Sequence, residues 1–359
     1  MKSRIMIVSG FLVLTMAIVY LLTGLQPGEN APVTETGKVE PYTETELIVY
    51  TAVEQDDLKR YSEAFNEDHP EIHVRWIQDS TGIITNRLIA EKKHPQADVV
   101  WGLSAISLMV LKEQDLLQPY APKGVEKLDK KFVDPSADIA WTGMDAWVAT
   151  ICYHPETLTG KSITPPLSWQ DLADARFEGL ITMPNPVSSG TGFMNVSAWL
   201  QIFGEEKGWE FMDALHRNIG WYTRSGSMPC QLVASGAIAI GVSFAYRGAQ
   251  LKATGVPIEL ITPTEGVGWD MEASAIIRGT TKLEAAKVLM DWSVSEKANA
   301  LYNQNYAVIA MPGLAKPVPG YPENIQASMI KNDFQYAARN RKSILEEWQR
   351  RYGAKTQAE

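Results

Sequence analysis

The sequence predicts an α/β protein with mainly parallel sheets. Short runs rich in β-branched and aromatic residues alternate along the chain with longer amphipathic runs, an order that is typical of strands followed by covering helices. The length supports the same class, because 359 residues with 45% hydrophobic composition are enough for two packed lobes and too many for one small core.

The first strand and helix show the pattern. The run ELIVYTA (46–52) is rich in β-forming residues, and Leu58, Tyr61 and Phe65 in the next segment share one face of an amphipathic helix. Further pairs follow in the same order: 72–77 with 80–93, 97–102 with 104–114, 179–184 with 190–204, and 237–244 with 245–254. In sheets of this class ligands bind where a strand ends and its helix begins, so these junctions are where a site is expected.

The charge of the chain excludes one class of partner. The net charge is −9 with a pI of about 5.2, and no basic stripe is available to neutralise nucleic-acid phosphates. We therefore expect no nucleic-acid partner, and an anionic ligand would have to be held by local donors.

The N-terminus predicts export. Lys2 and Arg4 precede an uncharged run over 5–25, which is typical of a secretory signal. The run is close to the roughly 20 residues that span a bilayer and no A-x-A cleavage site follows it, so residues 1–25 are either a signal peptide or a membrane anchor. The segment 26–45 is rich in Pro, Gly, Thr and Glu and predicts a disordered tether.

The chain contains two cysteines, Cys152 and Cys230. In an exported protein an isolated pair suggests a disulfide. Two buried thiols are the alternative.

Two strand–helix junctions are rich in hydroxyls and glycine: DSTG (79–82) and SSGTG (188–192). A helix N-terminus offers unpaired N–H groups, and neighbouring hydroxyls add donors without bulk. We predict that these junctions hold a tetrahedral oxyanion, with these residues as donors: Ser80, Thr81, Ser188, Ser189, Gly190 and Thr191. An ordinary helix cap is the alternative at each junction.

The sequence motifs that are typical of enzymes are absent or incomplete in this chain. The five histidines are scattered without metal-ligand spacing, GKS (160–162) lacks the first glycine of a phosphate loop, and GVSFA (241–245) ends in alanine where the nucleophile elbow needs glycine. GVGWDM (266–271) lacks the third glycine of a dinucleotide loop. We expect no metal, no cofactor and no enzyme activity, although a hydrolase stays open because triads are defined by geometry.

Several segments, in order, resemble periplasmic solute-binding proteins of ABC importers, in the branch that binds ferric ion and sugar phosphates. The similarity is greatest to the 2-aminoethylphosphonate-binding proteins and covers about residues 45–353. It rests on these segments: 49–58, 75–91, 97–103, 183–193 (MPNPVSSGTGF), 222–230 (YTRSGSMPC), 241–249 (GVSFAYRGA), 265–277 (EGVGWDMEASAII) and 329–341.

The resemblance implies the type II periplasmic-binding-protein fold, in which two α/β lobes joined by hinge strands close over a ligand. One lobe would comprise 45–148 and 264–315, and the other 149–263 and 316–355 with the C-terminal helices. The chain would cross between lobes near 146–154 and near 258–266, with Cys152 at the first crossing.

The resemblance also bears on metal binding. Iron-binding relatives hold ferric ion with adjacent tyrosines after the strand that corresponds to 237–244, and this chain has Phe244, Ala245 and Tyr246 there. One phenolate is missing, which argues against ferric ion as the ligand.

An aminophosphonate requires an ammonium site beside the anion site. Arg247 could add a charge-assisted bond to the phosphonate, or be an exposed arginine on a solvated helix turn. The candidates for the ammonium and its aromatic wall are Glu54, Asp270 and Glu272 with Trp101, Phe244, Tyr246 and Trp269. The alternative for Asp270 and Glu272 is a strand that points both carboxylates to water.

The sequence therefore predicts the periplasmic component of an ABC importer, a monomer that binds 2-aminoethylphosphonate and docks on an inner-membrane permease. Three alternatives stay open: a binder of another phosphorylated small molecule or of ferric ion, a periplasmic phosphoesterase, and a sensor module tethered through residues 5–25.

Overall fold

The computed structural model describes residues 45–323 and 325–355, which all belong to one compact unit. The predicted signal or anchor and the predicted tether, except its last residue, lie outside this range. Within it, no helix combines the length and apolar character needed to cross a membrane.

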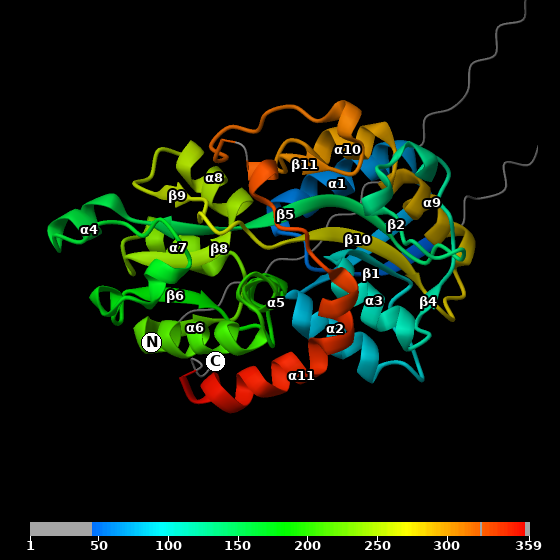
Figure 1. The fold of residues 1–359 in the computed structure, drawn as a ribbon. Helices are drawn as coiled ribbons and strands as arrows, with labels where there is room; N and C mark the ends of the chain where they lie inside the picture. The colour runs from blue at the N-terminus through cyan, green and yellow to red at the C-terminus, as the bar shows by residue number, and fades with distance from the viewer. Residues whose placement is uncertain (1–44, 324, 356–359) are drawn as a thin grey trace, which may run out of the picture. The chain divides into compact units, whose positions relative to one another are not determined.

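Strands and helices alternate as the sequence predicts (Figure 1). The strands are β1 (Thr45–Thr51), β2 (Ile72–Gln78), β3 (Val99–Ser104), β4 (Leu117–Gln118), β5 (Thr142–Tyr153), β6 (Ile181–Pro184), β7 (Ile219–Thr223), β8 (Ile240–Phe244), β9 (Glu259–Ile261), β10 (Trp269–Ile277) and β11 (Val308–Ile309). The helices are α1 (Gln55–Asp68), α2 (Thr81–Ala90), α3 (Ala105–Glu113), α4 (Pro155–Gly160), α5 (Gly190–Phe203), α6 (Glu205–Asn218), α7 (Met228–Ala234), α8 (Ala245–Ala253), α9 (Leu283–Ser293), α10 (Glu296–Tyr302) and α11 (Phe334–Tyr352).

The strands form one mixed sheet in the order β2-β1-β3-β10-β5-β8-β6-β7. Parallel pairs join β1 to β2 and β3, and β6 to β7 and β8. Between these groups, β5 and β10 pair antiparallel with each other and with their outer neighbours. The predicted α/β class is confirmed, with the parallel pairing confined to the two outer groups.

The long strand β5 belongs to both parts of the sheet (Figure 1). Its residues 142–148 pair with β10, and residues 149–153 pair with β8. We call β2, β1, β3, β10 and residues 142–148 the first half, and residues 149–153 with β8, β6 and β7 the second half. The predicted crossings between lobes and the predicted lobe boundaries stay predictions.

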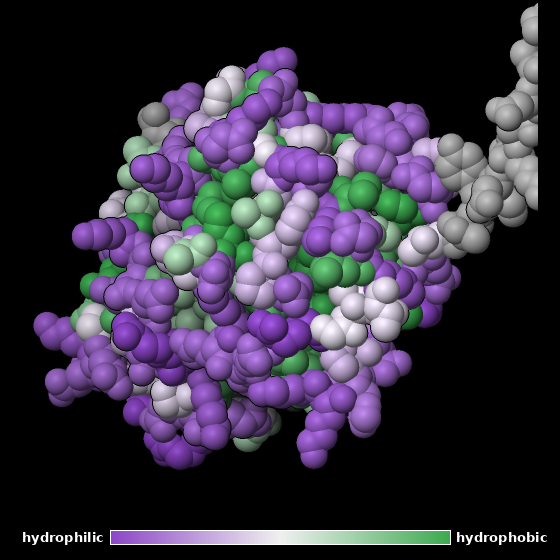
Figure 2. Space-filling view, turned by 90° about the vertical axis from the view of Figure 1, so that its right-hand side faces the viewer, coloured by the Kyte–Doolittle hydropathy of each residue, from purple (hydrophilic) through white to green (hydrophobic). Residues whose placement is uncertain are grey.

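Apolar faces of the helices explain the packing. Leu58, Tyr61 and Phe65 on α1 are buried as their spacing predicts. The last helix, α11, contacts both α3 and α5 and buries Trp348 and Tyr352. Hydrophilic side chains predominate on the face in Figure 2, with hydrophobic groups between them.

Candidate functional site

A cleft of about 570 Å³ opens where the carboxyl ends of strands from both halves meet. Nine residues predicted for the site line it: Glu54, Ser80, Thr81, Ser189, Gly190, Thr191, Phe244, Arg247 and Glu272. The first half contributes the residues after β1 and β2, and the second half those after β6 and β8. The arrangement follows from sheet topology, because parallel strands of one group end at the same edge.

Hydroxyls and glycines gather at one part of the lining, which we call the hydroxyl cluster: Ser80, Thr81, Ser189, Gly190, Thr191 and Gly226. The residues lie close together, since a β-carbon at Gly190 would lie 2.8 Å from the Thr81 Oγ1 atom and one at Gly226 would lie 2.3 Å from the Thr191 Oγ1 atom. Only glycine allows the chains this approach.

Two helices begin at the hydroxyl cluster. Ser189 is the N-cap of α5, and its Oγ atom accepts the Gly192 N–H at 3.3 Å. Ser80 is the N-cap of α2, and its carbonyl accepts the Ile83 N–H at 2.9 Å. Ordinary capping is therefore present at Ser189, and its hydroxyl proton can still be donated into the cleft.

Sequence reasoning missed the loop between β7 and α7 as a site. Arg224, Ser225, Gly226 and Ser227 all line the cleft. The loop carries the same signal as the predicted junctions, since RSGS follows a strand and precedes a helix.

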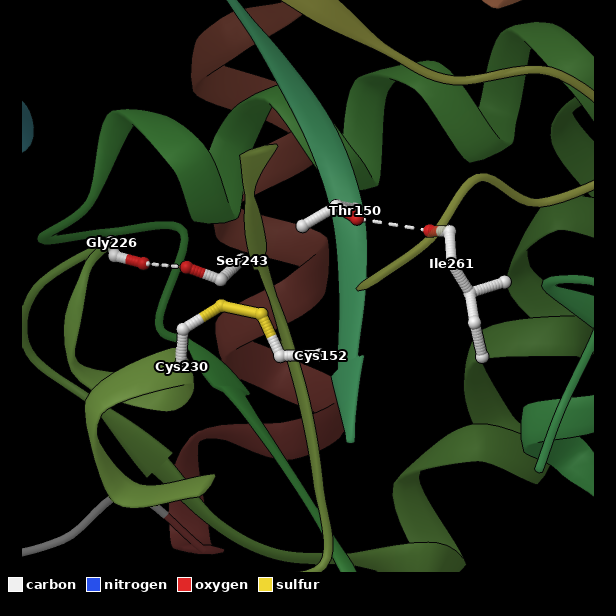
Figure 3. Close-up of a disulfide and its surroundings, with 6 residues drawn as sticks. All are labelled: Thr150, Cys152, Gly226, Cys230, Ser243 and Ile261. Atoms are coloured by element: carbon white, nitrogen blue, oxygen red, sulfur yellow. Dashed lines mark hydrogen bonds between the residues drawn. A yellow bond between two sulfur atoms is a disulfide. The ribbon is translucent and has the colours of Figure 1, made fainter. Parts of the chain in front are cut away.

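This loop is anchored from behind (Figure 3). The Ser243 hydroxyl on β8 donates to the Gly226 carbonyl at 2.6 Å. The predicted disulfide is present between Cys152 on β5 and Cys230 on α7, the helix that follows the loop. Both contacts fix the loop to the strands at the middle of the sheet.

The two halves contact each other directly across the cleft. The Gly82 N–H donates to the Ser188 carbonyl at 2.9 Å. Arg224 pairs with Asp79 at 3.0 Å. The Asp79 carboxylate, which also accepts the Ser80 N–H at 2.7 Å, is thus balanced by a cation beside the hydroxyl cluster.

The structure corrects the prediction that Ser188 donates to an oxyanion ligand. It does not line the cleft, because its hydroxyl donates to the Arg224 carbonyl at 2.8 Å. Its backbone makes the contact to Gly82. The residue therefore holds the loops in place instead of facing a ligand.

Arg247 and Glu54, predicted for opposite ends of a ligand, pair with each other. The guanidinium lies 2.8 Å from the Glu54 carboxylate and is buried. Arg247 also contacts Gln250, while its Nε atom has no partner. The alternative of an exposed arginine on a solvated turn is wrong.

A second group of polar residues extends from the floor of the cleft into the interior, and we call it the carboxyl cluster: Glu272 and Tyr306, which line the cleft, with Asp57, Asp145 and Tyr246, which are buried and do not line it. Glu272 lines the cleft while only 7% exposed. Its Oε1 atom accepts the Tyr306 hydroxyl at 3.0 Å, and its Oε2 atom has no partner. The alternative in which Glu272 points to water is wrong.

Asp145 sits directly beside Glu272. The two residues are paired across β5 and β10, so their side chains share one face of the sheet. Asp145 is fully buried and neither of its carboxyl oxygens has a partner. Burial, together with the neighbouring carboxyls, raises the pKa of Asp145 and the pKa of Glu272 well above the ordinary values.

Tyr246 belongs behind the cleft and does not line it. Its hydroxyl donates to the Asp57 carboxylate at 2.9 Å. Asp57 also contacts Arg60 and Asn305. Burial raises the pKa of Asp57, while these donors lower it.

Two of the three other predicted aromatic residues are core residues. Trp101 packs against Trp76 and Trp292. The Trp269 indole N–H donates to the Ile330 carbonyl at 2.9 Å. The cleft is lined by Trp147 and Tyr306, which sequence reasoning missed, and by Phe244.

Asp270 is also a correction. It is buried away from the cleft lining, where it accepts the Ser104 hydroxyl and the Met271 N–H. Burial raises the pKa of Asp270 to about 7. The two hydrogen bonds and the N–H groups of Ala105 and Ile106 lower this pKa, but by less than burial raises it. The carboxylate thus supports the start of α3.

Across 45–323 and 325–355, no three histidine, cysteine or acidic residues are grouped so that they could hold a metal ion.

Comparisons with known proteins agree with this geometry. A family model described as bacterial extracellular solute-binding protein matches residues 94–338. A protein of Sinorhizobium fredii named as an ABC transporter periplasmic-binding protein is 26% identical over 265 residues, covering 71% of this chain and 71% of that protein. A Salmonella typhimurium protein named for 2-aminoethylphosphonate binding is 23% identical over 236 residues, covering 63% of this chain and 66% of that protein.

A solved structure shows the same fold. The periplasmic binding protein AfuA from Actinobacillus pleuropneumoniae, with fructose 6-phosphate bound, superposes with a TM-score of 0.81 at 25% identity. The superposition covers 86% of this chain and 99% of that chain. It confirms the predicted type II periplasmic-binding-protein fold.

Proposed function

The chain belongs to the bacterial extracellular solute-binding proteins, and from that premise we propose that it binds 2-aminoethylphosphonate in this cleft for an ABC importer. The observation that carries the proposal is one cleft lined both by hydroxyl donors at helix starts and by Glu272, whose buried Oε2 atom has no hydrogen-bond partner among the described residues. Such a cleft suits a ligand with an anionic end and a cationic end.

The hydroxyl cluster supports the anionic end. Ser189 and Thr191 come from the second half and Ser80 and Thr81 from the first, so one oxyanion can receive donors from both. Helix N-termini favour anions through their unpaired N–H groups and the helix dipole. Arg224 and Arg247 are already paired with carboxylates, so donation here is mainly by neutral groups.

The carboxyl cluster supports the cationic end. The free Oε2 atom of Glu272 would accept an ammonium proton, and Trp147, Phe244 and Tyr306 offer aromatic surface in the same cleft. A ligand without the amine would leave the buried carboxylate unpaired, which is costly. The Salmonella relative named for this ligand supports the same choice.

In the proposed cycle, ligand enters between the halves, hinge closure brings the hydroxyl cluster together, and the closed protein docks on an inner-membrane permease. The protein acts in the periplasm as a monomer. Sequencing the mature N-terminus tests whether residues 1–25 are removed or retained as an anchor, as the sensor alternative requires.

Calorimetry with residues 45–359, expressed in an oxidising compartment, tests the ligand. Titrants are 2-aminoethylphosphonate, ethylphosphonate, phosphoethanolamine, fructose 6-phosphate, inorganic phosphate and ferric citrate. Micromolar or tighter binding of the aminophosphonate, with much weaker binding of ethylphosphonate, is expected. Binding of ferric citrate alone would overturn the proposal.

A sugar phosphate is a second candidate. The cleft of about 570 Å³ exceeds what a two-carbon phosphonate fills, and Gln55, Gln78 and Gln231 are among the residues that line it. AfuA was solved with fructose 6-phosphate in a closely similar fold. If fructose 6-phosphate binds and the aminophosphonate does not, this candidate replaces the first.

A further inference from the structure

The floor of the cleft holds more negative charge than its surroundings balance. Glu272 and Asp145 lie opposite each other on β10 and β5, and three of their four carboxyl oxygens have no hydrogen-bond partner among the residues that the structure describes. The charged groups acting on Asp145 are the carboxyls of Glu272 and Asp57. An ionised pair in this position would face repulsion without a compensating donor.

The groups around the pair explain why no side chain supplies the missing positive charge. The surrounding titratable or charged side chains are Glu54, Asp57, Arg60 and Tyr61 near α1, Tyr246 and Arg247 on α8, Tyr302 and Tyr306 at and after α10, and Tyr321. Of these, the two arginines are paired with Asp57 and Glu54. The tyrosines can donate one proton each, and Tyr306 does so to Glu272.

We propose that the Glu272–Asp145 pair accepts either a ligand cation or a proton, so that the closed cleft selects ligands by charge in a pH-dependent manner. The inference rests on the proposed function and adds a regulation to it. With an ammonium group on the ligand, Glu272 closes as a carboxylate. With a ligand that lacks a cation, Glu272 closes in its protonated form, so protein molecules in which Glu272 is ionised take up a proton from solvent.

The two kinds of ligand therefore respond differently to pH. A ligand without an amine binds with proton uptake, so its affinity falls as the pH rises. A zwitterionic ligand binds at neutral pH without proton uptake at Glu272. This residue therefore does not make the affinity for the zwitterionic ligand fall as the pH rises. The pKa of Glu272 and the pKa of Asp145 are both raised. The scheme requires this direction, because a carboxyl with a raised pKa can hold a proton near neutral pH.

The experiment compares Glu272→Gln with the unmodified protein by calorimetry from about pH 5.5 to 8.5, the range into which buried carboxyls are shifted. Titrants are 2-aminoethylphosphonate and ethylphosphonate. Ionisation of the ligands themselves is the same for both proteins, so the difference between the proteins isolates residue 272. Glu113→Gln, at an exposed position, is the control for loss of charge.

At neutral pH, Glu272→Gln should lose aminophosphonate affinity by about tenfold or more, because a charged partner is lost. The same variant should bind ethylphosphonate more tightly than the unmodified protein does, and the pH dependence contributed by residue 272 should disappear. Asp145→Asn should move the fall in ethylphosphonate affinity to lower pH, because repulsion on Glu272 is gone.

Parallel pH profiles for ethylphosphonate in the unmodified protein and in Glu272→Gln would overturn the inference while leaving the ligand proposal intact. If neither phosphonate binds, the ligand proposal falls and potentiometric titration of the ligand-free proteins decides the inference. Identical proton binding above about pH 6 by the unmodified protein, Glu272→Gln and Asp145→Asn would overturn it. A loss of bound protons in the variants would support it.

Discussion

The hydroxyl cluster lines the cleft, the carboxyl cluster reaches the same cleft through Glu272 and Tyr306, and the two are built on opposite principles. The hydroxyl cluster uses glycines, hydroxyls and helix starts, and Ser189 and Ser80 already cap helices there. The carboxyl cluster uses acidic side chains on the central strands β5 and β10 and on helix α1, with Asp145 fully buried and without a hydrogen-bond partner among the described residues. The first is satisfied without a ligand, and the second is not.

The contrast between the two clusters indicates which residues discriminate among ligands. Donors at helix starts can serve any tetrahedral oxyanion, because neutral hydroxyls and N–H groups adapt to several anions. A buried carboxylate without a partner penalises every ligand that fails to neutralise it. We therefore assign general anion affinity to the hydroxyl cluster and choice among ligands to the carboxyl cluster.

Removing the disulfide should have the largest effect and should damage only the hydroxyl cluster. The bond closes a loop with a sequence separation of 78, for which the chain-entropy model gives about 4 kcal/mol of stability. Denaturant unfolding of Cys152→Ser/Cys230→Ser should show this loss, together with weaker phosphonate binding through the 224–227 loop. Equal stability of the variant and the unmodified protein would contradict the prediction.

Gly82→Ala should block the contact between the halves. A β-carbon there would lie 2.1 Å from the Val187 carbonyl oxygen, which is backbone and cannot swing away. Overpacking of this kind costs about 2–3 kcal/mol, and calorimetry should show the cost as lost ligand affinity. Gly160→Ala, with no atom within 4 Å of the added carbon, is the matched control. Unchanged binding by Gly82→Ala would mean that the ligand-bound form lacks this contact.

Ser189→Ala separates capping from ligand binding. Ser295 caps α10 in the same way, through its Oγ atom and the Ala298 N–H, and lies outside the cleft lining. Each alanine variant should lose about 1 kcal/mol of stability. Only Ser189→Ala should also lose about 1–3 kcal/mol of phosphonate binding free energy. Equal binding by both variants would move the anion away from α5.

Asp145→Asn should give the smallest change, a gain in stability that depends on pH. The folded protein raises the pKa of this carboxyl, so it costs stability as the pH rises above the ordinary carboxyl range. The variant should match the unmodified protein near pH 4 and be more stable by about 1 kcal/mol near pH 8. A variant that is less stable at both pH values would show that the carboxylate has a partner in solution.

The α/β class, the disulfide as one of two alternatives, and most of the hydroxyl cluster could be predicted from the amino-acid sequence. Strand–helix alternation and the hydroxyl-rich junctions are local patterns, so Ser80, Thr81, Ser189, Gly190 and Thr191 could be placed without coordinates. The same local signal at 224–227 was present and was missed, because 219–223 was not among the predicted strands.

The remaining features could not be predicted from local patterns, because they depend on which strands become neighbours in the fold. Alternation along 269–272 places Asp270 and Glu272 on one face and cannot say that one supports α3 while the other reaches the cleft. Asp145 gains its importance solely from lying opposite Glu272 across β5 and β10, more than a hundred residues apart in the chain. The pairing of Arg247 with Glu54 likewise arises from helices of different halves. The sequence specifies which ionisable side chains are present. Long-range packing creates the electrostatic environment that sets their charge states.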